Sequence, residues 1–154
     1  MTTRYLEDYT DGEIIVCGSF RLEREELITF AERYDAQPMH IDEDYSQHTG
    51  PFGNVIASGF QTVAIAFKLF QEMGFFEGDV ALGGPGMDEV RWLKPVFPDD
   101  VLTNHATVLE ARRSRSKPDR GVIRVKHDLR NQSGDTVVTC ITASMIRCRD
   151  LPAG

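Results

Sequence analysis

The chain has 154 residues and a net charge of −7, with 41% hydrophobic and 27% charged residues, a composition typical of one globular domain with its own core. The acidic excess disfavours DNA or RNA as a partner, because phosphate contacts need clustered lysine and arginine. The chain shows neither a secretory signal at its start nor an apolar run of about 18 residues, so we expect a cytoplasmic protein that does not span a membrane.

The first half of the chain predicts one short strand and two helices. Residues 13–20 have the apolar, β-branched composition of a strand, and residues 22–35 have helical spacing of apolar side chains. A glycine- and proline-bearing loop follows at residues 49–54. Residues 58–74 then predict a long helix that is apolar around almost its whole circumference, so we expect the rest of the fold to wrap around it.

From about residue 80 the apolar period changes to two, which predicts strands. Residues 121–131 alternate cleanly and indicate a half-buried antiparallel strand in which His127 is a core histidine. The other expected strands are 90–96, 100–111 and 136–149, with a hairpin turn at 131–135. The simplest arrangement is α+β, a curved antiparallel sheet wrapped around one long central helix, in a single domain over residues 1–154.

Cysteine and histidine spacing gives no sign of a metal site. The three cysteines form no C-x-x-C pair, and the four histidines show no i, i+4 spacing. We therefore predict buried, reduced thiols and no metal.

The segment YDAQPMHIDEDY places an aspartate and a histidine on either side of a proline. Because Pro38 interrupts a continuous helix, we expect the preceding helix to end near Asp35 and an extended turn to bring His40 back beside it. A carboxylate and an imidazole around one water molecule can take a proton from it and supply one elsewhere. The spacing leaves open an alternative, in which Asp42 or Asp44 caps a short helix and the histidine lies on the surface.

The segment IASGFQT places Gly59 in the first turn of the long predicted helix, after Ser58 as a possible N-cap. Free backbone N–H groups at such a helix start can stabilise an oxyanion that develops on a thioester or ester carbonyl. The alternative is that Gly59 only permits close packing where the helix begins.

The connection EARRSRSKPDRG holds the one basic cluster of this acidic chain, with Arg113, Arg115 and Lys117 among its residues. Arginine suits bidentate phosphate contacts, so one interpretation is a clamp for a phosphate-bearing substrate. The other is a solvated loop whose charges keep a sheet edge from pairing with neighbours.

In their order and spacing, YDAQPMHIDEDY, IASGFQT, VRWLKPVFPDDVL and SRSKPDRG resemble the MaoC-like dehydratases and R-specific enoyl-CoA hydratases of the hot-dog fold, over about residues 12–148. The resemblance implies a homodimer or higher homo-oligomer with sites near the subunit interface. It also implies reversible addition of water to a trans-2-enoyl thioester, giving the R-3-hydroxyacyl product. The substrate would be an acyl-CoA or an acyl-carrier thioester, with coenzyme A as part of the substrate and no separate cofactor.

Carried over by position, the resemblance implies that Asp35 and His40 hold and activate the water and that the backbone N–H of Gly59 polarises the thioester carbonyl. Gln37 and Pro38 would shape the turn between the pair, and these two residues with Ser58 are candidate substrate-binding residues.

The chain also departs from the family pattern. Ser58 stands where many of the hydratases carry histidine, which puts a polar side-chain role there in doubt, and Gln37 stands where they often have asparagine. Asp88 and Glu89 stand where relatives can carry a serine close to the catalytic pair, which would alter the charge of the pocket or indicate a different substrate.

A hydratase/dehydratase is the first functional prediction, and two alternatives stay open. A carboxylate and a helix-terminus oxyanion site would also serve an acyl-CoA thioesterase, and the fold could carry a non-catalytic acyl-thioester binding module. The acyl chain length is open; candidates for setting the depth of the pocket are Phe52, Phe75, Phe76 and Trp92.

Overall fold

A five-stranded antiparallel sheet forms the centre of the computed structural model, which describes residues 2–151. The strand order is β1-β3-β4-β5-β2, and the strands are β1 (Ile14–Arg21), β2 (Ala81–Trp92), β3 (Val101–Arg113), β4 (Arg120–Arg130) and β5 (Thr136–Arg147). Because β3, β4 and β5 pair as consecutive hairpins, the predicted antiparallel meander in the second half of the chain is confirmed.

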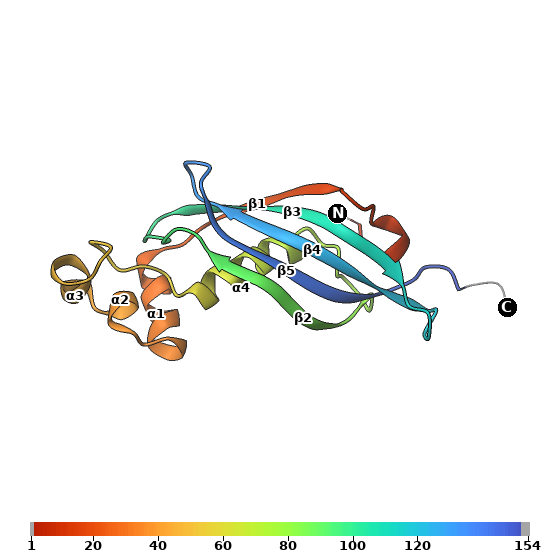
Figure 1. Cartoon of the computed structure of the whole chain (residues 1–154), viewed down its shortest axis with the longest axis horizontal. Coiled ribbons are helices and arrows are strands. Elements are labelled where there is room, and N and C mark those ends of the chain that lie inside the picture. Colours follow the sequence, from red (N-terminus) through yellow and green to blue (C-terminus); the bar gives the residue numbers. More distant parts are fainter. Residues whose placement is uncertain (1, 152–154) are drawn as a thin grey trace.

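One long helix crosses the sheet, and helices α1, α2 and α3 gather at one end of the molecule (Figure 1). The helical segments are η1 (Leu6–Asp8), α1 (Arg24–Tyr34), α2 (Pro38–Ile41), α3 (Glu43–His48) and α4 (Gly59–Gln71). Helix α4 contacts β1, β3, β4 and β5, so the predicted α+β arrangement of a sheet around one central helix is confirmed. Among residues 2–151, no helix is both long and apolar enough to cross a membrane.

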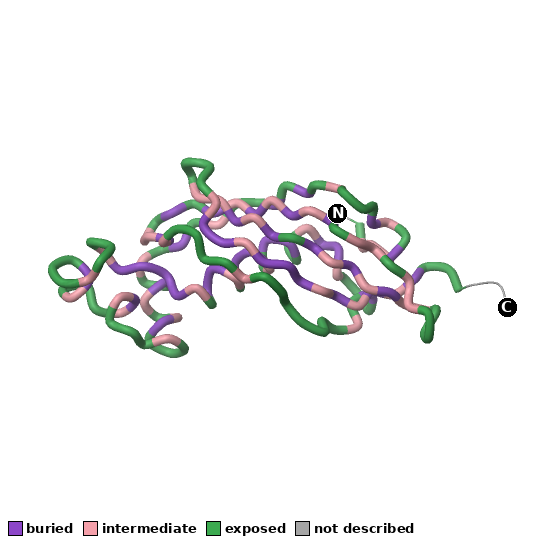
Figure 2. The backbone as a smooth tube through the Cα atoms, viewed as in Figure 1, coloured by how far each residue is buried: buried purple, intermediate pink, exposed green. Residues whose placement is uncertain are grey.

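The core lies between α4 and the middle strands, where buried backbone predominates in Figure 2. Every second residue of β4 faces this core, as the alternating sequence predicts. The buried side chains of that strand include Ile123, Val125, His127 and Leu129. The three cysteines are free and buried, as predicted, and burial raises the pKa of the Cys17 thiol to about 11.

A buried polar chain links α4 to three strands through His127, which has no exposed surface. The amide nitrogen of Asn104 donates to the carbonyl of Ala66 at 2.8 Å and lies 2.9 Å from Nδ1 of His127, which accepts from it. The proton of the imidazole is therefore on Nε2, 2.8 Å from Oγ1 of Thr142. Burial lowers the pKa of His127 to about 4, so the ring is neutral at physiological pH.

Two expectations for the fold were wrong in detail. The central helix is shorter than residues 58–74, and one stripe of it is uncovered: Phe60 is 66% exposed and Ala64 is exposed. Strand β2 begins at Ala81 rather than at residue 90. The sequence did not predict this first part of the strand, because its glycines and proline obscure the apolar alternation typical of a strand. The strand is exposed along most of its length (Figure 2), and its outer edge has no neighbouring strand among residues 2–151.

Candidate active site

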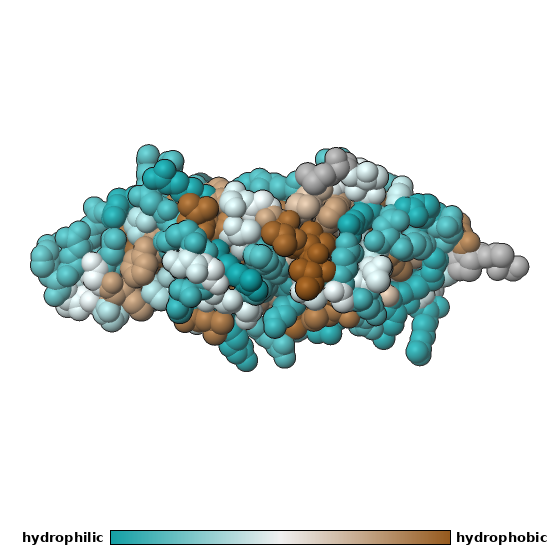
Figure 3. All heavy atoms as spheres, turned by 90° about the horizontal axis from the view of Figure 1, so that it is seen from above, coloured by the Kyte–Doolittle hydropathy of each residue, from teal (hydrophilic) through white to brown (hydrophobic). Residues whose placement is uncertain are grey.

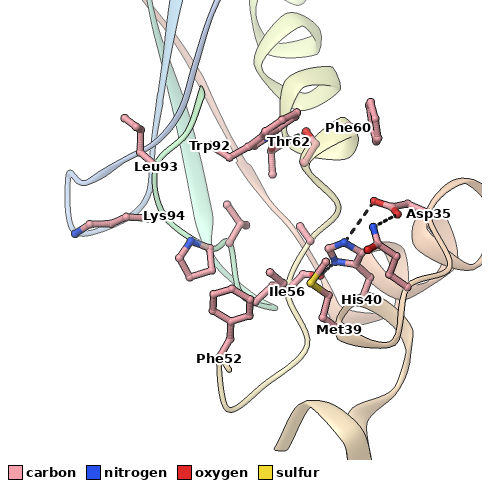
Figure 4. Close-up of a pocket in the computed structure, with 15 residues that line it drawn as sticks. Asp35, Met39, His40, Phe52, Ile56, Phe60, Thr62, Trp92, Leu93 and Lys94 are labelled. Atoms are coloured by element: carbon pink, nitrogen blue, oxygen red, sulfur yellow. Dashed lines mark hydrogen bonds and ion pairs between the residues drawn. The ribbon is translucent and has the colours of Figure 1, made fainter. Parts of the chain in front are cut away.

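Asp35 and His40 come together where α1 ends and α2 begins. Asp35 is the residue that follows α1, and its backbone N–H donates to the carbonyl of Ala31 at 2.8 Å. Pro38 starts α2 at the position where a missing N–H costs nothing. His40 therefore lies in a short helical turn rather than in the extended turn expected from the sequence. Its Nε2 is 3.4 Å from Oδ2 of Asp35, and Figure 4 shows the two side chains facing each other.

The imidazole of His40 has one orientation imposed on it. Its Nδ1 lies 2.7 Å from the carbonyl oxygen of Ile56, which can only accept, so Nδ1 carries the proton and Nε2 presents a lone pair. His40 is 4% exposed.

Asp42 does cap α3, since its carboxylate accepts from the N–H of Tyr45 at 2.9 Å. Helix capping at Asp42 thus coexists with a buried His40, and the alternative of a surface histidine was wrong.

The carboxylate of Asp35 accepts two side-chain hydrogen bonds. Nε2 of Gln37 donates to Oδ1 at 2.7 Å, and the hydroxyl of Ser58 donates to Oδ2 at 2.7 Å. The bond from Gln37, followed by that from Ser58 and the nearby His40, lowers the pKa of Asp35, so the carboxylate is ionised at neutral pH. Ser58 occupies the N-cap position of α4, but its side chain caps no N–H group and turns to the carboxylate instead.

A pocket of about 460 Å³ opens beside this pair. Asp35, Gln37 and His40 form its polar side, and apolar side chains form most of the remaining wall (Figure 4). These apolar lining residues are Met39, Phe52, Ile56, Phe60, Trp92, Leu93, Pro95 and Val96. Polar groups at one side of a largely apolar pocket suit a ligand with one reactive polar centre and an apolar chain.

The first turn of α4 reaches the pocket at Gly59. Within residues 2–151, the backbone N–H groups of Gly59 and Phe60 have no hydrogen-bond acceptor, as expected at a helix start without a side-chain cap. A Cβ built on Gly59 would overlap Cε2 and Nε1 of Trp92 and lie 2.9 Å from Cζ2. Glycine is therefore needed here for close packing, and its free N–H is at the same time available to a ligand.

The predicted basic cluster lies away from this pocket. The connection between β3 and β4 is at the opposite end of the sheet from α1, α2 and α3 (Figure 1). Arg113 pairs with Glu7 at 2.7 Å and donates to the carbonyls of Pro118 and Asp150. Arg115 and Lys117 are exposed in the connection. None of these three basic residues lines the pocket of its own chain.

Of the other positions singled out from the sequence, some line the pocket and others do not. Pro38 begins α2 without lining the pocket, whereas Phe52 and Trp92 both line it. Phe75 belongs to the core. Asp88 and Glu89, the two acidic departures from the family pattern, lie on β2 and do not line the pocket.

Two contacts within the site were missed from the sequence, although Ser58 itself was a candidate site residue. The Ile56 carbonyl and the Ser58 hydroxyl act on His40 and Asp35, which are 16 and 23 residues away in the chain. The only available signal was the polar Ser58 before a glycine in an apolar segment. Among residues 2–151, no three His, Cys, Asp or Glu side chains gather in a way that could hold a metal ion.

The antiparallel sheet around a central helix defines a hot-dog protein, and the Asp–His pair beside a free helix start is its candidate acid–base site. The family model of the MaoC like domain matches residues 11–131. The chain is 32% identical to the MaoC-like dehydratase of Rhodospirillum rubrum, whose crystal structure superposes with a TM-score of 0.85 over 96% of this chain and 99% of that one.

Two curated proteins are also similar. The chain is 36% identical over 127 residues to the uncharacterized protein YdeM of Bacillus subtilis. The aligned segment covers 82% of this chain and 87% of that protein. It is 38% identical over 73 residues to mesaconyl-CoA hydratase of Cereibacter sphaeroides, a match to 47% of this chain and 21% of that enzyme. The chain belongs to the MaoC-like dehydratase family.

Proposed function

We propose that the protein adds water reversibly to trans-2-enoyl thioesters, with CoA as the carrier, to give R-3-hydroxyacyl thioesters. The observation that carries the proposal is the pair of Asp35 and His40, 3.4 Å apart and facing an apolar pocket beside the free N–H of Gly59. Membership of the MaoC-like dehydratase family and the partial similarity to mesaconyl-CoA hydratase support the reaction class.

The pair is suited to hold one water molecule. Nε2 of His40 and Oδ2 of Asp35 both present lone pairs, and 3.4 Å is too long for a strong direct hydrogen bond. A water molecule that bridges the two atoms from the side of the pocket can donate one hydrogen to each. Its oxygen lone pairs then point away from both acceptors, toward a substrate carbon in the pocket.

We assign the proton transfers to His40. Nε2 takes a proton from the water as the water oxygen bonds to C3 of the enoyl group, and the π electrons move onto the thioester oxygen. The resulting enolate then collapses, and C2 takes the proton from Nε2, so the product has gained one water and no oxidant or reductant is needed. Because the pKa of Asp35 is held low, the carboxylate stays ionised, orients the water and balances the charge of the imidazolium. The Gly59 N–H stabilises the enolate oxygen.

A hydration assay tests the proposal. Asp35→Asn and His40→Gln are each expected to lower the rate of enoyl-CoA hydration by about 10²–10⁴-fold, while circular dichroism and the melting temperature show a folded protein. The assay should cover an enoyl-CoA chain-length series, including branched chains, with chiral analysis of the product. A wild-type protein inert towards the whole series contradicts the proposal. Release of free CoA thiol faster than hydration would indicate a thioesterase instead.

We also propose that the protein is a homo-oligomer joined through β2. This strand is exposed on both faces and lies at a sheet edge, a state that natural sheets usually avoid by pairing or cover. An apolar groove of about 590 Å³ runs between it and α4, with Phe60, Ala64 and Met87 among its walls. A two-fold axis beside β2 would pair two copies of the strand and cover this groove in each copy.

Sedimentation equilibrium tests the assembly. The wild-type protein should sediment as a dimer or larger species at micromolar concentration, and Met87→Asp should shift it towards monomer, because Met87 is 41% exposed beside the groove. A monomeric wild-type protein contradicts the proposal.

A further inference from the structure

Trp92, the single tryptophan of the chain, lies against the first turn of α4 (Figure 4). It is the last residue of β2, and the nitrogen-bearing edge of its indole occupies the space that a side chain at Gly59 would need. The ring of Phe60 makes an edge contact with it, with centroids 6.2 Å apart and planes at 69°. Two neighbouring residues of α4 thus fix where the indole lies.

The indole N–H of Trp92 has no acceptor among residues 2–151, although it can only donate. The side chain is 53% exposed and lines the same pocket as Asp35 and His40. Its indole nitrogen overlaps the position that a Cβ of Gly59 would take, and the backbone N–H of Gly59 also has no acceptor within the described chain. Two neighbouring residues with unused donors, Gly59 and Trp92, therefore line the same pocket as the acid–base pair.

We propose that Nε1–H of Trp92 is a second hydrogen-bond donor to the thioester carbonyl oxygen, alongside the N–H of Gly59, which makes Trp92 a catalytic residue. The inference rests on the proposed hydration, in which negative charge develops on that oxygen as water adds to C3. Donors fixed in advance where charge develops stabilise the transition state more than the ground state.

The size of the effect follows from the exposure of the indole. Loss of one donor from a buried oxyanion site costs about 10²–10³-fold in kcat. Trp92 is half exposed in the single chain, so water can partly replace its N–H. We expect roughly a 10- to 100-fold loss of kcat for Trp92→Phe, which keeps an aromatic ring and removes the donor.

The first experiment observes the carbonyl directly. A saturated, unreactive thioester, butyryl-CoA labelled with ¹³C at the carbonyl, is bound to the wild type and to the variants Trp92→Phe and Trp92→His, and its stretching frequency is measured by infrared difference spectroscopy. Binding itself is followed through the emission of Trp92 in the wild type and by calorimetry in the variants. We expect a lower carbonyl frequency in the wild type than in Trp92→Phe, with partial recovery in Trp92→His, which retains an N–H.

Equal carbonyl frequencies in the wild type and Trp92→Phe overturn the inference, even if Trp92→Phe binds butyryl-CoA more weakly. Weaker binding with an unchanged carbonyl frequency is what a purely apolar contact of Trp92 would give. A wild type whose Trp92 emission does not respond to butyryl-CoA and whose calorimetry shows no binding also overturns it.

The second experiment separates this inference from the proposed function. Hydration by Trp92→Phe should lose kcat with little change in KM, whereas Asp35→Asn should lose hydration almost completely. An unaffected kcat in Trp92→Phe beside an inactive Asp35→Asn overturns the role of Trp92 and leaves the hydratase intact. A fully active Asp35→Asn overturns the role of Asp35, and a wild type that hydrates no enoyl-CoA overturns the hydratase. In either case the carbonyl frequency still decides whether Trp92 is a donor.

Discussion

After Gln37, the hydroxyl of Ser58 contributes most to the lowered pKa of Asp35, and it does so from a fully buried position. We predict that Ser58→Ala raises the pKa of Asp35, because the carboxylate loses one of the two side-chain hydrogen bonds that lower it. If the ionised carboxylate is the active form, the acid limb of the pH profile of kcat/KM moves to higher pH, and activity at neutral pH falls by roughly tenfold through loss of a charge-assisted hydrogen bond.

The control for this prediction is Ser19→Ala, the same substitution at an exposed serine that bonds to Thr103 on the sheet. It should leave the pH profile unchanged. An unmoved acid limb in Ser58→Ala would show that this hydroxyl does not govern the ionisation of Asp35.

Gly59 and Trp92 form a second pair whose interaction is measurable. We predict that Gly59→Ala destabilises the protein by about 1 kcal/mol, because the added methyl group displaces the indole, and that Trp92→Ala in the same chain relieves this cost. Urea denaturation of the wild type, both single variants and the double variant gives the coupling energy. Additive effects would mean that the indole does not lie against Gly59 in solution.

At the scale of the elements, the sequence predicted best where one periodicity ran undisturbed. Helix α1 and strand β4 follow their apolar patterns closely, since each has one face in the core. Helix α2 escaped notice because four residues are too few to show a period. The first part of β2 was not predicted, because its side chains are exposed in this chain and so do not alternate between apolar and polar residues.

The site was predictable in part for a similar physical reason. Asp35 and His40 are close in the chain, so proline chemistry and spacing suggested their meeting. The contacts of Ser58 with Asp35 and of Ile56 with His40 depend on how α4 and its preceding segment pack against α1 and α2. Such tertiary contacts leave no local pattern. The same holds for Trp92, whose position over Gly59 depends on where β2 ends.

The basic connection between β3 and β4 could contribute to a binding site through the proposed dimer. Its exposed Arg115 and Lys117 are at the far end of the sheet from the pocket of the same chain (Figure 1). A two-fold axis beside β2 exchanges the ends of the two sheets, so the connection of one copy comes to the end that holds the pocket of the other. In that proposed dimer, the two cations would lie toward the distal phosphates of a CoA substrate bound by the partner.

We predict that Arg115→Ala with Lys117→Ala raises KM for an enoyl-CoA by several-fold and leaves KM for an enoyl-pantetheine unchanged, since only CoA carries the phosphates. Steady-state kinetics on both substrates measures the ratio. Arg113 is kept intact, because its pairing with Glu7 gives it a structural role. An equal rise for both substrates would exclude a phosphate contact.

At the scale of the whole molecule, apolar surface remains on both edges of the sheet. Besides the groove beside β2, the view from above shows an apolar patch on a largely hydrophilic surface (Figure 3). On β1, at the edge of the sheet opposite β2, the exposed large apolar side chains are Ile14 and Val16, 68% and 58% exposed. The groove differs from this patch because it adjoins a free strand edge and the candidate active site through Phe60. Assembly at β2 would therefore couple directly to the pocket.

The buried chain through His127 joins the helix to the sheet and makes the stability of the whole fold depend on pH. The folded protein holds the pKa of His127 at about 4, against 6.5 for an unperturbed histidine. Between pH 6.5 and pH 4, His127 is therefore protonated in the unfolded chain but stays neutral in the folded chain. The free energy of unfolding falls as the pH drops through this range. Between pH 7 and pH 5 this group alone should remove about 2 kcal/mol.

Urea denaturation at pH 7 and pH 5 measures this loss, and most carboxylates stay ionised in that interval. His127→Gln is expected to be less stable than the wild type at pH 7, because Asn104 and Thr142 lose their fitted partner, but to lose about 2 kcal/mol less on acidification. His48→Gln is the matched control, since the side chain of His48 is 69% exposed, and it should keep the wild-type dependence on pH. If His127→Gln and the wild type lose the same free energy between the two pH values, the buried imidazole is not what makes the fold sensitive to acid.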